Sequence, residues 1–189
     1  MTAAGWREIN CDVCVDSPYL RVMRECVATP TRPDGVEWMV VRRKQAVVVA
    51  PRTDAGGFLM ICQERVPIRC QLWEFPAGQI DGAVTEETIH ATAHRELAEE
   101  TGWRTTDPMV SLGNYWPSAG FTDEYCHLFL ATGVHRFDTE HRPDQSEMIL
   151  ECREFALGEI WTMIADGVIC DANSLAAIAR MVAMGHLSR

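Results

Sequence analysis

Arg-Glu-Leu-Ala-Glu-Glu-Thr-Gly, residues 95–102, is the stretch of this sequence that decides its fold and its chemistry. At 3.6 residues per turn, Glu96 and Glu100 project from one face of a helix, and Glu99 lies one row aside. Like charges four residues apart repel each other on an isolated helix, so this cluster needs a compensating cation. A hard divalent ion, Mg²⁺ or Mn²⁺, prefers carboxylate and carbonyl oxygens and keeps positions open for water and phosphate.

The helix that carries these acids has recognisable ends and a buried stripe. Thr85 is a suitable N-cap, and two glutamates follow it at the positive end of the helix. Gly102 closes the helix. Ile89, Ala93 and Leu97 recur every four residues, which predicts the face that packs on the core.

Residues 95–103 resemble the core of the Nudix box, which reads Arg-Glu-aliphatic-x-Glu-Glu-x-Gly-apolar. Glu87 stands eight residues before Arg95, as the box requires. Gly78 resembles the leading glycine, but it stands nine residues before Glu87 where the box has six. The three extra residues within 79–86 are expected in the loop before the helix, where insertions are tolerated.

Further segments are similar to the Nudix branch that cleaves ADP-ribose and related nucleoside diphosphate sugars. These are Gln63-Glu64-Arg65, the run Trp73-Glu74-Phe75-Pro76-Ala77-Gly78-Gln79-Ile80-Asp81, and Ser118-Ala119-Gly120-Phe121-Thr122-Asp123-Glu124. The branch usually has proline where this chain has Ala119. The resemblance covers residues 17–185 and implies a Nudix-type α/β/α sandwich around a mixed β-sheet. It also implies Mg²⁺-dependent cleavage of ADP-ribose to AMP and ribose 5-phosphate, with GDP-mannose and UDP-glucose as alternative substrates.

By the same resemblance, the metal ligands are the box carboxylates and one backbone carbonyl: Glu96, Glu99, Glu100 and Ala77. Gly78 would allow a tight turn beside that carbonyl. A pyrophosphate repels an anionic nucleophile until cations neutralise it, and a bound cation also lowers the pKa of water. The resemblance further makes Arg95 a structural partner of Glu87, two helical turns away.

Two more side chains are expected at the substrate. Arg65 resembles an arginine that clamps the diphosphate, because a planar guanidinium suits phosphate oxygens; an ordinary surface ion pair is the alternative. Glu74 would bind the terminal sugar or orient Arg65. The general base would come from the acidic segment 138–147, with Glu147 as first candidate and Asp144 as second. An ordinary solvated loop remains the alternative there.

The first part of the chain is expected to form a separate extension. Residues 19–28 and 37–43 flank a Pro- and Gly-containing turn at 29–35, which predicts a β-hairpin within an antiparallel extension, 1–44, before a Nudix domain at 45–189. The resemblance implies that this extension forms a homodimer and that Trp38 of one subunit stacks on the nucleobase bound by the other. A position in the interface or the core is an equal alternative for this tryptophan. His90, His94 and His127 receive no role, and the first two are expected at solvent or an interface.

The rest of the chain predicts interleaved strands and helices. Buried strands are expected at 45–50 and 58–62, paired around the Gly-rich turn 54–57. Further strands are expected at 109–115, 125–132 and 148–156, and a last helix at 172–184.

The composition limits which partners and which compartment are plausible for this protein. The net charge of −10 argues against nucleic acid and an anionic membrane surface as partners. The eight cysteines are scattered, mostly within apolar runs, so we expect reduced, buried thiols in a cytoplasmic protein. Cys11 and Cys14 have the spacing of half a zinc site, but no second pair lies near them.

Two non-enzymatic interpretations compete with a hydrolase. An ADP-ribose-sensing Nudix domain would typically lose box carboxylates and gain a basic segment that binds DNA, whereas this chain keeps every carboxylate of the box. A non-catalytic module for divalent ions would not need Arg65, the Pro-Ala-Gly turn or the acidic segment.

Overall fold

The computed structural model describes residues 5–137 and 148–188. By its internal contacts the chain divides into two compact units. The first is Met1–Lys44 with Trp116–Tyr125, and the second is Gln45–Tyr115 with Cys126–Arg189. Residues 116–125, placed in the Nudix domain on sequence, thus group with the N-terminal unit. No helix in the described ranges is long and apolar enough to cross a membrane.

The first unit is built on a three-stranded antiparallel sheet. Its strands, in the order in which they pair, are β1 (Arg7–Asp16), β2 (Arg21–Thr29) and β3 (Arg32–Arg42). The hairpin of β2 and β3 turns at residues 30–31, because Thr29 already pairs with Arg32, so the predicted seven-residue turn is wrong. Strand β1 was not predicted, although Ile9, Cys11, Val13 and Val15 alternate with mostly polar residues, the two-residue period of a strand.

Residues 116–125 are bound to β3 within this unit. The N–H of Val41 donates to the carbonyl of Phe121 at 2.7 Å. Arg42 donates to Asp123 at 3.0 Å and to Glu25 of β2 at 2.6 Å. These bonds fix the segment beside the sheet.

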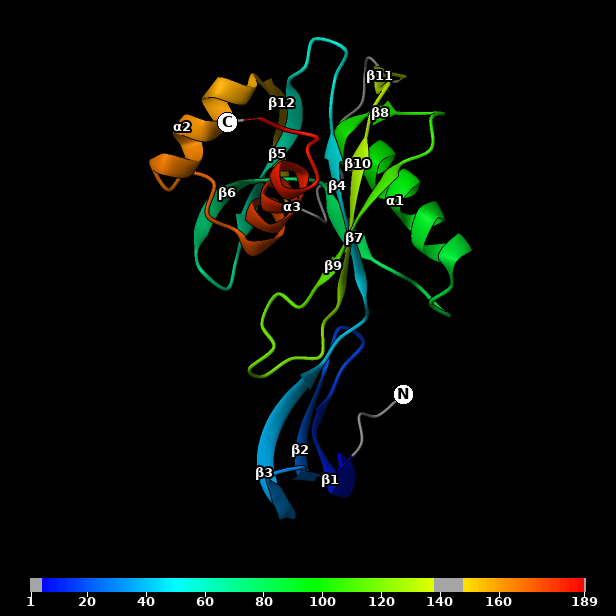
Figure 1. Ribbon diagram of the computed structural model, residues 1–189, viewed down its shortest axis with the longest axis vertical. Helices are drawn as coiled ribbons and strands as arrows, with labels where there is room; N and C mark the ends of the chain where they lie inside the picture. Colours follow the sequence, from blue (N-terminus) through cyan, green and yellow to red (C-terminus); the bar gives the residue numbers. More distant parts are fainter. Residues whose placement is uncertain (1–4, 138–147, 189) are drawn as a thin grey trace. The chain divides into compact units, whose positions relative to one another are not determined.

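The second unit contains the remaining elements (Figure 1). Its strands are β4 (Ala46–Pro51), β5 (Phe58–Arg65), β6 (Cys70–Glu74), β7 (Ala77–Gln79), β8 (Trp103–Arg104), β9 (Val110–Tyr115), β10 (Cys126–Ala131), β11 (His135–Arg136) and β12 (Ile149–Phe155). Its helices are α1 (Glu86–Thr101), α2 (Leu157–Ala165) and α3 (Ala172–Ala183). One sheet has the order β7-β4-β10-β9, a second β12-β5-β6, and β11 pairs with β8. Strand β10 runs parallel to β4 and antiparallel to β9, so the first sheet is mixed, as predicted.

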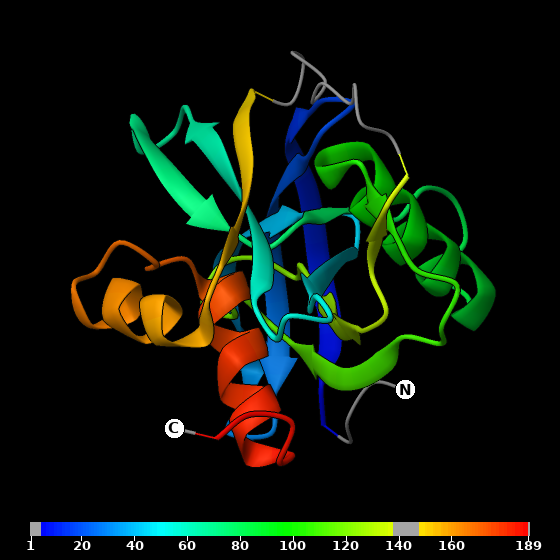
Figure 2. The same cartoon turned by 90° about the horizontal axis from the view of Figure 1, so that it is seen from above.

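Strand β4 is buried on both faces, and each face packs against a different helix. Val48 and its even-numbered neighbours join the apolar cluster of α3, whereas Val47 and Val49 join Ala93 and Leu97 of α1. Because successive side chains of a strand point to opposite faces, one β-branched run serves both layers. Figures 1 and 2 show α1 and α3 on opposite sides of this sheet, and the predicted mixed α/β fold is confirmed.

The predicted pairing of β4 with β5 is wrong, although both strands exist. Only a single bridge, between Arg52 and Phe58, joins them, and β5 pairs with β12 and β6 instead. At Gly57 the backbone runs so close to β12 that an added Cβ would lie 2.9 Å from the carbonyl oxygen of Phe155. The turn therefore delivers β5 into the neighbouring sheet.

Candidate active site

The helix that carries the acidic cluster begins and ends where the sequence predicts. The hydroxyl of Thr85 accepts from the N–H of Thr88 at 3.2 Å, and the hydroxyl of Thr88 accepts from the N–H of Thr85 at 2.9 Å. Gly102 lies at φ +73°, a left-handed C-cap that suits glycine. These local bonds fix the ends of α1 and hence the direction of its side chains.

Two of the three box carboxylates are buried. Glu96 and Glu100 each have a relative exposure of 3%, whereas the side chain of Glu99 is 53% exposed. A buried carboxylate is stable only where cations or N–H donors compensate its charge. The two buried carboxylates, one helical turn apart, therefore need cations or N–H donors beside them.

The turn that precedes the box encloses these carboxylates. The N–H of Ala77 donates to Oε2 of Glu100 at 2.9 Å. A Cβ added to Gly78 would lie 1.8 Å from Oε1 of Glu96, so only glycine fits there while Glu96 keeps this position. The peptide of residues 77–78 thus lies directly against both acids.

Arg95 is part of the acidic cluster rather than a partner of Glu87. Its guanidinium donates to Glu96 at 2.6 Å, to Glu99 at 2.7 Å and to the carbonyl of Gln79 at 3.4 Å. The predicted pair with Glu87 is therefore wrong; Glu87 is exposed in the first turn of α1. Arg95 instead ties the helix to strand β7 and neutralises part of the cluster.

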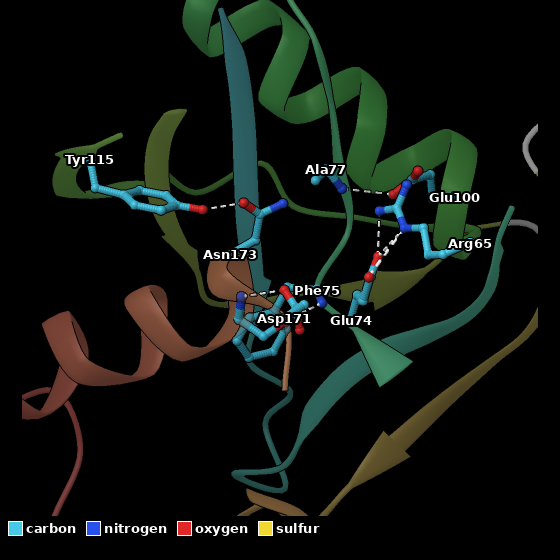
Figure 3. A network of polar contacts seen from close by, with 9 residues as sticks. Arg65, Glu74, Phe75, Ala77, Glu100, Tyr115, Asp171 and Asn173 are labelled. Carbon is cyan, nitrogen blue, oxygen red and sulfur yellow. Dashed lines mark hydrogen bonds and ion pairs between the residues drawn. The ribbon is translucent and has the colours of Figure 1, made fainter. Parts of the chain in front are cut away.

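Arg65, at the end of β5, forms an ion pair with Glu74 at the end of β6 (Figure 3). Nε of Arg65 donates to Oε2 of Glu74 at 2.9 Å, and a terminal guanidinium nitrogen donates to the same oxygen. Burial alone would lower the pKa of Arg65, but the hydrogen bond and charge of Glu74, with the charges of Glu100 and Asp171, outweigh it and raise that pKa. Glu74 is 4% exposed and orients Arg65, one of the two roles considered for it.

A group that the sequence analysis missed supports this strand from α3. The buried hydroxyl of Ser174 accepts from the N–H of Phe75 at 2.9 Å. Asp171, the N-cap of α3, accepts from the N–H of Ser174 at 2.7 Å, and the hydroxyl of Tyr115 donates to Asn173. The Asp171–Ser174 spacing is a signal for a helix cap, but it does not predict contact with a strand 99 residues away.

Burial perturbs the carboxyl group of Asp171. Desolvation raises its pKa, the hydrogen bonds of Ser174 oppose the shift, and the charge of Glu74 adds to it. In the described part of the chain, its Oδ2 atom is buried without a hydrogen-bond partner.

The remaining residues singled out on sequence are Trp38, Glu147, Asp144 and the histidines. Trp38 belongs to the first unit, is 55% exposed and donates from Nε1 to the carbonyl of Gly120 at 2.8 Å. Glu147 and Asp144 lie outside the described residues. Among the histidines, His90 packs on the ring of Phe129 at 4.9 Å between centroids, a core contact rather than the predicted solvent or interface position.

The residues present fit a divalent cation. No three His, Cys, Asp or Glu side chains within 5–137 and 148–188 group closely enough to form a complete cage. Mg²⁺ does not require one, because it usually binds through one or two carboxylates and completes its shell with water and substrate phosphates. Glu96 and Glu100, buried beside the Ala77–Gly78 peptide, supply such a donor set.

Comparisons with known proteins agree with this geometry. The family model of the NUDIX domain matches residues 42–178. An ADP-ribose pyrophosphatase of Bacillus subtilis (strain 168) is 32% identical over 139 residues, 74% of this chain and 72% of that protein. A methanol dehydrogenase activator of Bacillus methanolicus has the same identity and the same coverage.

The fold has a match among solved structures as well. A crystal structure of an ADP compounds hydrolase aligns with a TM-score of 0.75 at 17% identity, covering 99% of this chain and 100% of that one. The chain belongs to the Nudix family and is a pyrophosphohydrolase.

Proposed function

We propose that this protein hydrolyses the pyrophosphate bond of ADP-ribose, or of a related nucleoside diphosphate sugar, in a reaction that depends on Mg²⁺. One observation carries the proposal: two buried carboxylates, Glu96 and Glu100, lie against the Ala77–Gly78 peptide. The B. subtilis relative is named for this substrate, which supports the same assignment. The products would be AMP and ribose 5-phosphate.

Glu96, Glu100 and the carbonyl of Ala77 would hold the metal, with Glu99 as a further ligand from its exposed position. The bound ion would neutralise the pyrophosphate and lower the pKa of water. Arg65, held by Glu74, would contact the diphosphate through its remaining N–H groups, because the guanidinium has five donors. Glu147 would act as the general base, with Asp144 as the alternative.

Trp38 would bind the nucleobase. It lines a cavity of about 500 Å³ within the first unit, together with Trp6, Glu25, Val27, Thr29, Val36, Val40, Ala119 and Gly120. Stacking of a base on an aromatic side chain contributes about 1–3 kcal/mol.

The extension 1–44 would pair two copies into a homodimer. Apolar side chains on its sheet are strongly exposed, with relative exposures of 56% at Val13 and 50% at Val15. Exposed apolar surface of this kind is typical of an interface. We also propose that the enzyme works in the cytoplasm, where its cysteines, all free in the structure, remain reduced.

A product assay tests the function. The protein is incubated with ADP-ribose, GDP-mannose and UDP-glucose, with Mg²⁺ or with EDTA, and the products are separated by chromatography. We expect Mg²⁺-dependent release of AMP from ADP-ribose at the highest kcat/KM of the panel. A preference for another sugar would replace the substrate assignment, and full turnover in EDTA would contradict the metal assignment.

The variant Glu100→Gln separates metal binding from folding. The amide oxygen of glutamine can still accept from the N–H of Ala77, so we expect the folded structure to survive while kcat falls by about 100-fold or more. Glu86→Gln, in the exposed first turn of the same helix, is the matched control and should keep its activity. Wild-type turnover in Glu100→Gln would remove this residue from the metal site.

A further inference from the structure

A second arginine lies beside Arg65 at the tip of the β5–β6 hairpin. A cavity of about 720 Å³ is lined there by Glu64, Arg65, Val66, Arg69, Cys70 and Gln71. That volume is within the range of sites that hold ligands of drug size, roughly 300–1,000 Å³. The cavity lies entirely in the second unit, next to the residue that the proposed function places on the diphosphate.

The two arginines of this cavity differ in their partners. Arg65 is neutralised by the buried carboxylate of Glu74. The guanidinium of Arg69 is exposed and has no acidic or hydrogen-bonding side-chain partner among the residues that the structure describes. Glu64 is the one acid among the described lining residues, and on a strand its side chain points to the face opposite that of its neighbour Arg65. Among the described residues, the guanidinium of Arg69 is thus a cation at the tip of the hairpin that no acid neutralises.

The backbone at Arg69 has a conformation that residues with a side chain rarely adopt. Its φ is +55°, in the left-handed region, and its N–H donates to the carbonyl of Arg65 at 2.8 Å to close the turn. Glycine would adopt this conformation without the steric cost that an L-residue with a Cβ meets. Strained residues of this kind cluster at ligand-binding positions.

We propose that this cavity binds an anionic group on the terminal sugar of a nucleoside diphosphate sugar, and that Arg69 is the residue that selects for it. The proposal rests on the proposed function, in which Arg65 contacts the diphosphate, so that the cavity beside Arg65 lies next to a group that the diphosphate carries. A phosphate monoester and a carboxylate share the chemistry required, because each presents two oxygens to a planar guanidinium.

Matched substrate pairs test this selectivity. ADP-ribose is compared with ADP-ribose 1″-phosphate, and UDP-glucose with UDP-glucuronate, so that each pair differs by one anionic group. We expect the wild type to prefer the anionic member of at least one pair by about 10- to 100-fold in kcat/KM, the effect of one charge-assisted, bidentate contact. A preference in the first pair alone identifies a phosphate as the ligand. A preference in the second pair alone identifies a carboxylate.

The variant Arg69→Gly isolates the guanidinium, because it relieves the left-handed strain. We expect it to be at least as resistant to thermal unfolding as the wild type and to lose the preference for the anionic substrate, because the loss of kcat/KM falls mainly on the anionic member of each pair. Arg69→Lys should keep part of the preference. Arg24→Ala, which removes one exposed positive charge from the first unit, is the control and should leave the preference unchanged.

Calorimetric titration in EDTA measures binding of ADP-ribose and of its 1″-phosphate without hydrolysis. If the wild type cleaves neither compound but Arg69 still sets their relative affinities, the proposed function fails and the cavity assignment stands. If ADP-ribose is cleaved, the proposed function stands. The cavity assignment is then wrong if neither anionic group raises kcat/KM. It is also wrong if Arg69→Gly lowers kcat/KM equally for both substrates of each pair.

Discussion

At the scale of single residues, Gly78 is the position where the backbone lies directly against the buried carboxylate of Glu96. A methyl group at residue 78 would overlap Glu96, so Gly78→Ala must displace either the strand or the buried acid. We expect the free energy of unfolding to fall by about 1–3 kcal/mol, the usual effect of overpacking. Urea unfolding measures it, and Mg²⁺-dependent turnover should fall as well.

A second substitution identifies the cause of that loss. Glu96→Ala removes the overlapping carboxylate, so the double variant Gly78→Ala/Glu96→Ala should recover stability relative to Gly78→Ala but no activity. Gly158→Ala, where an added Cβ meets nothing within 4 Å, is the matched control. Equal destabilisation at residues 78 and 158 would contradict the close approach.

Helical periodicity was enough to place Glu96 and Glu100 on one face of α1, but it could not decide where the arginine would bind. Arg95 has acids within reach at several helical spacings, and a flexible side chain chooses among them by the groups that surround it. Those groups include the carbonyl of Gln79, which comes from strand β7. Only the packing of strand against helix settles the choice.

At the scale of secondary structure, the N-terminus of α3 holds a buried carboxyl group, that of Asp171, whose pKa the fold raises. Burial raises the pKa of Asp171 above the value of about 3.9 that an unfolded chain gives. A raised folded pKa contributes stability below the unfolded pKa and loses it as the pH rises through the folded value. At neutral pH the ionised Asp171 therefore costs stability.

Asp171→Asn keeps the helix cap and removes the charge. We expect its Tm at pH 7 to exceed that of the wild type by about 2–4 °C, the shift that a change of about 1 kcal/mol gives at this size. This difference in Tm should vanish as the pH falls toward about 4. Thermal scans at several pH values measure it. Asp166→Asn, which removes an exposed carboxylate at the end of α2, is the control for the loss of one charge. A pH-independent gain in Asp171→Asn would contradict the explanation.

Elements with strong local signals were predicted, and elements fixed by distant partners were not. Helix α1 has a capping hydroxyl, a buried stripe and a C-terminal glycine, and its bounds were correct. Helix α2 was missed because its N-cap is Ala156, which has no capping side chain, and its cap bond comes from Glu159. Strands β6 and β7 are short and exist through pairing with β5 and β4, which sequence patterns do not specify.

At the scale of the whole molecule, the exposed apolar side chains of β1 lead to a prediction about assembly. We expect a dimer by analytical ultracentrifugation. Val13→Glu/Val15→Glu should weaken it by about 100-fold or more, because an unpaired charge buried at an interface costs several kcal/mol. Val168→Glu, at an exposed valine of the second unit, is the control and should leave the dimer intact. A wild-type monomer at all concentrations would contradict the assembly.

The bond from Ser174 to Phe75 has a consequence for how the enzyme is made. Strand β6, the turn that follows it and helix α1 all precede residue 105 in the sequence. The N–H of Phe75 in that turn nevertheless binds the hydroxyl of Ser174, which comes much later in the chain. We therefore expect this turn to reach its final order only after α3 has packed against it, late in folding.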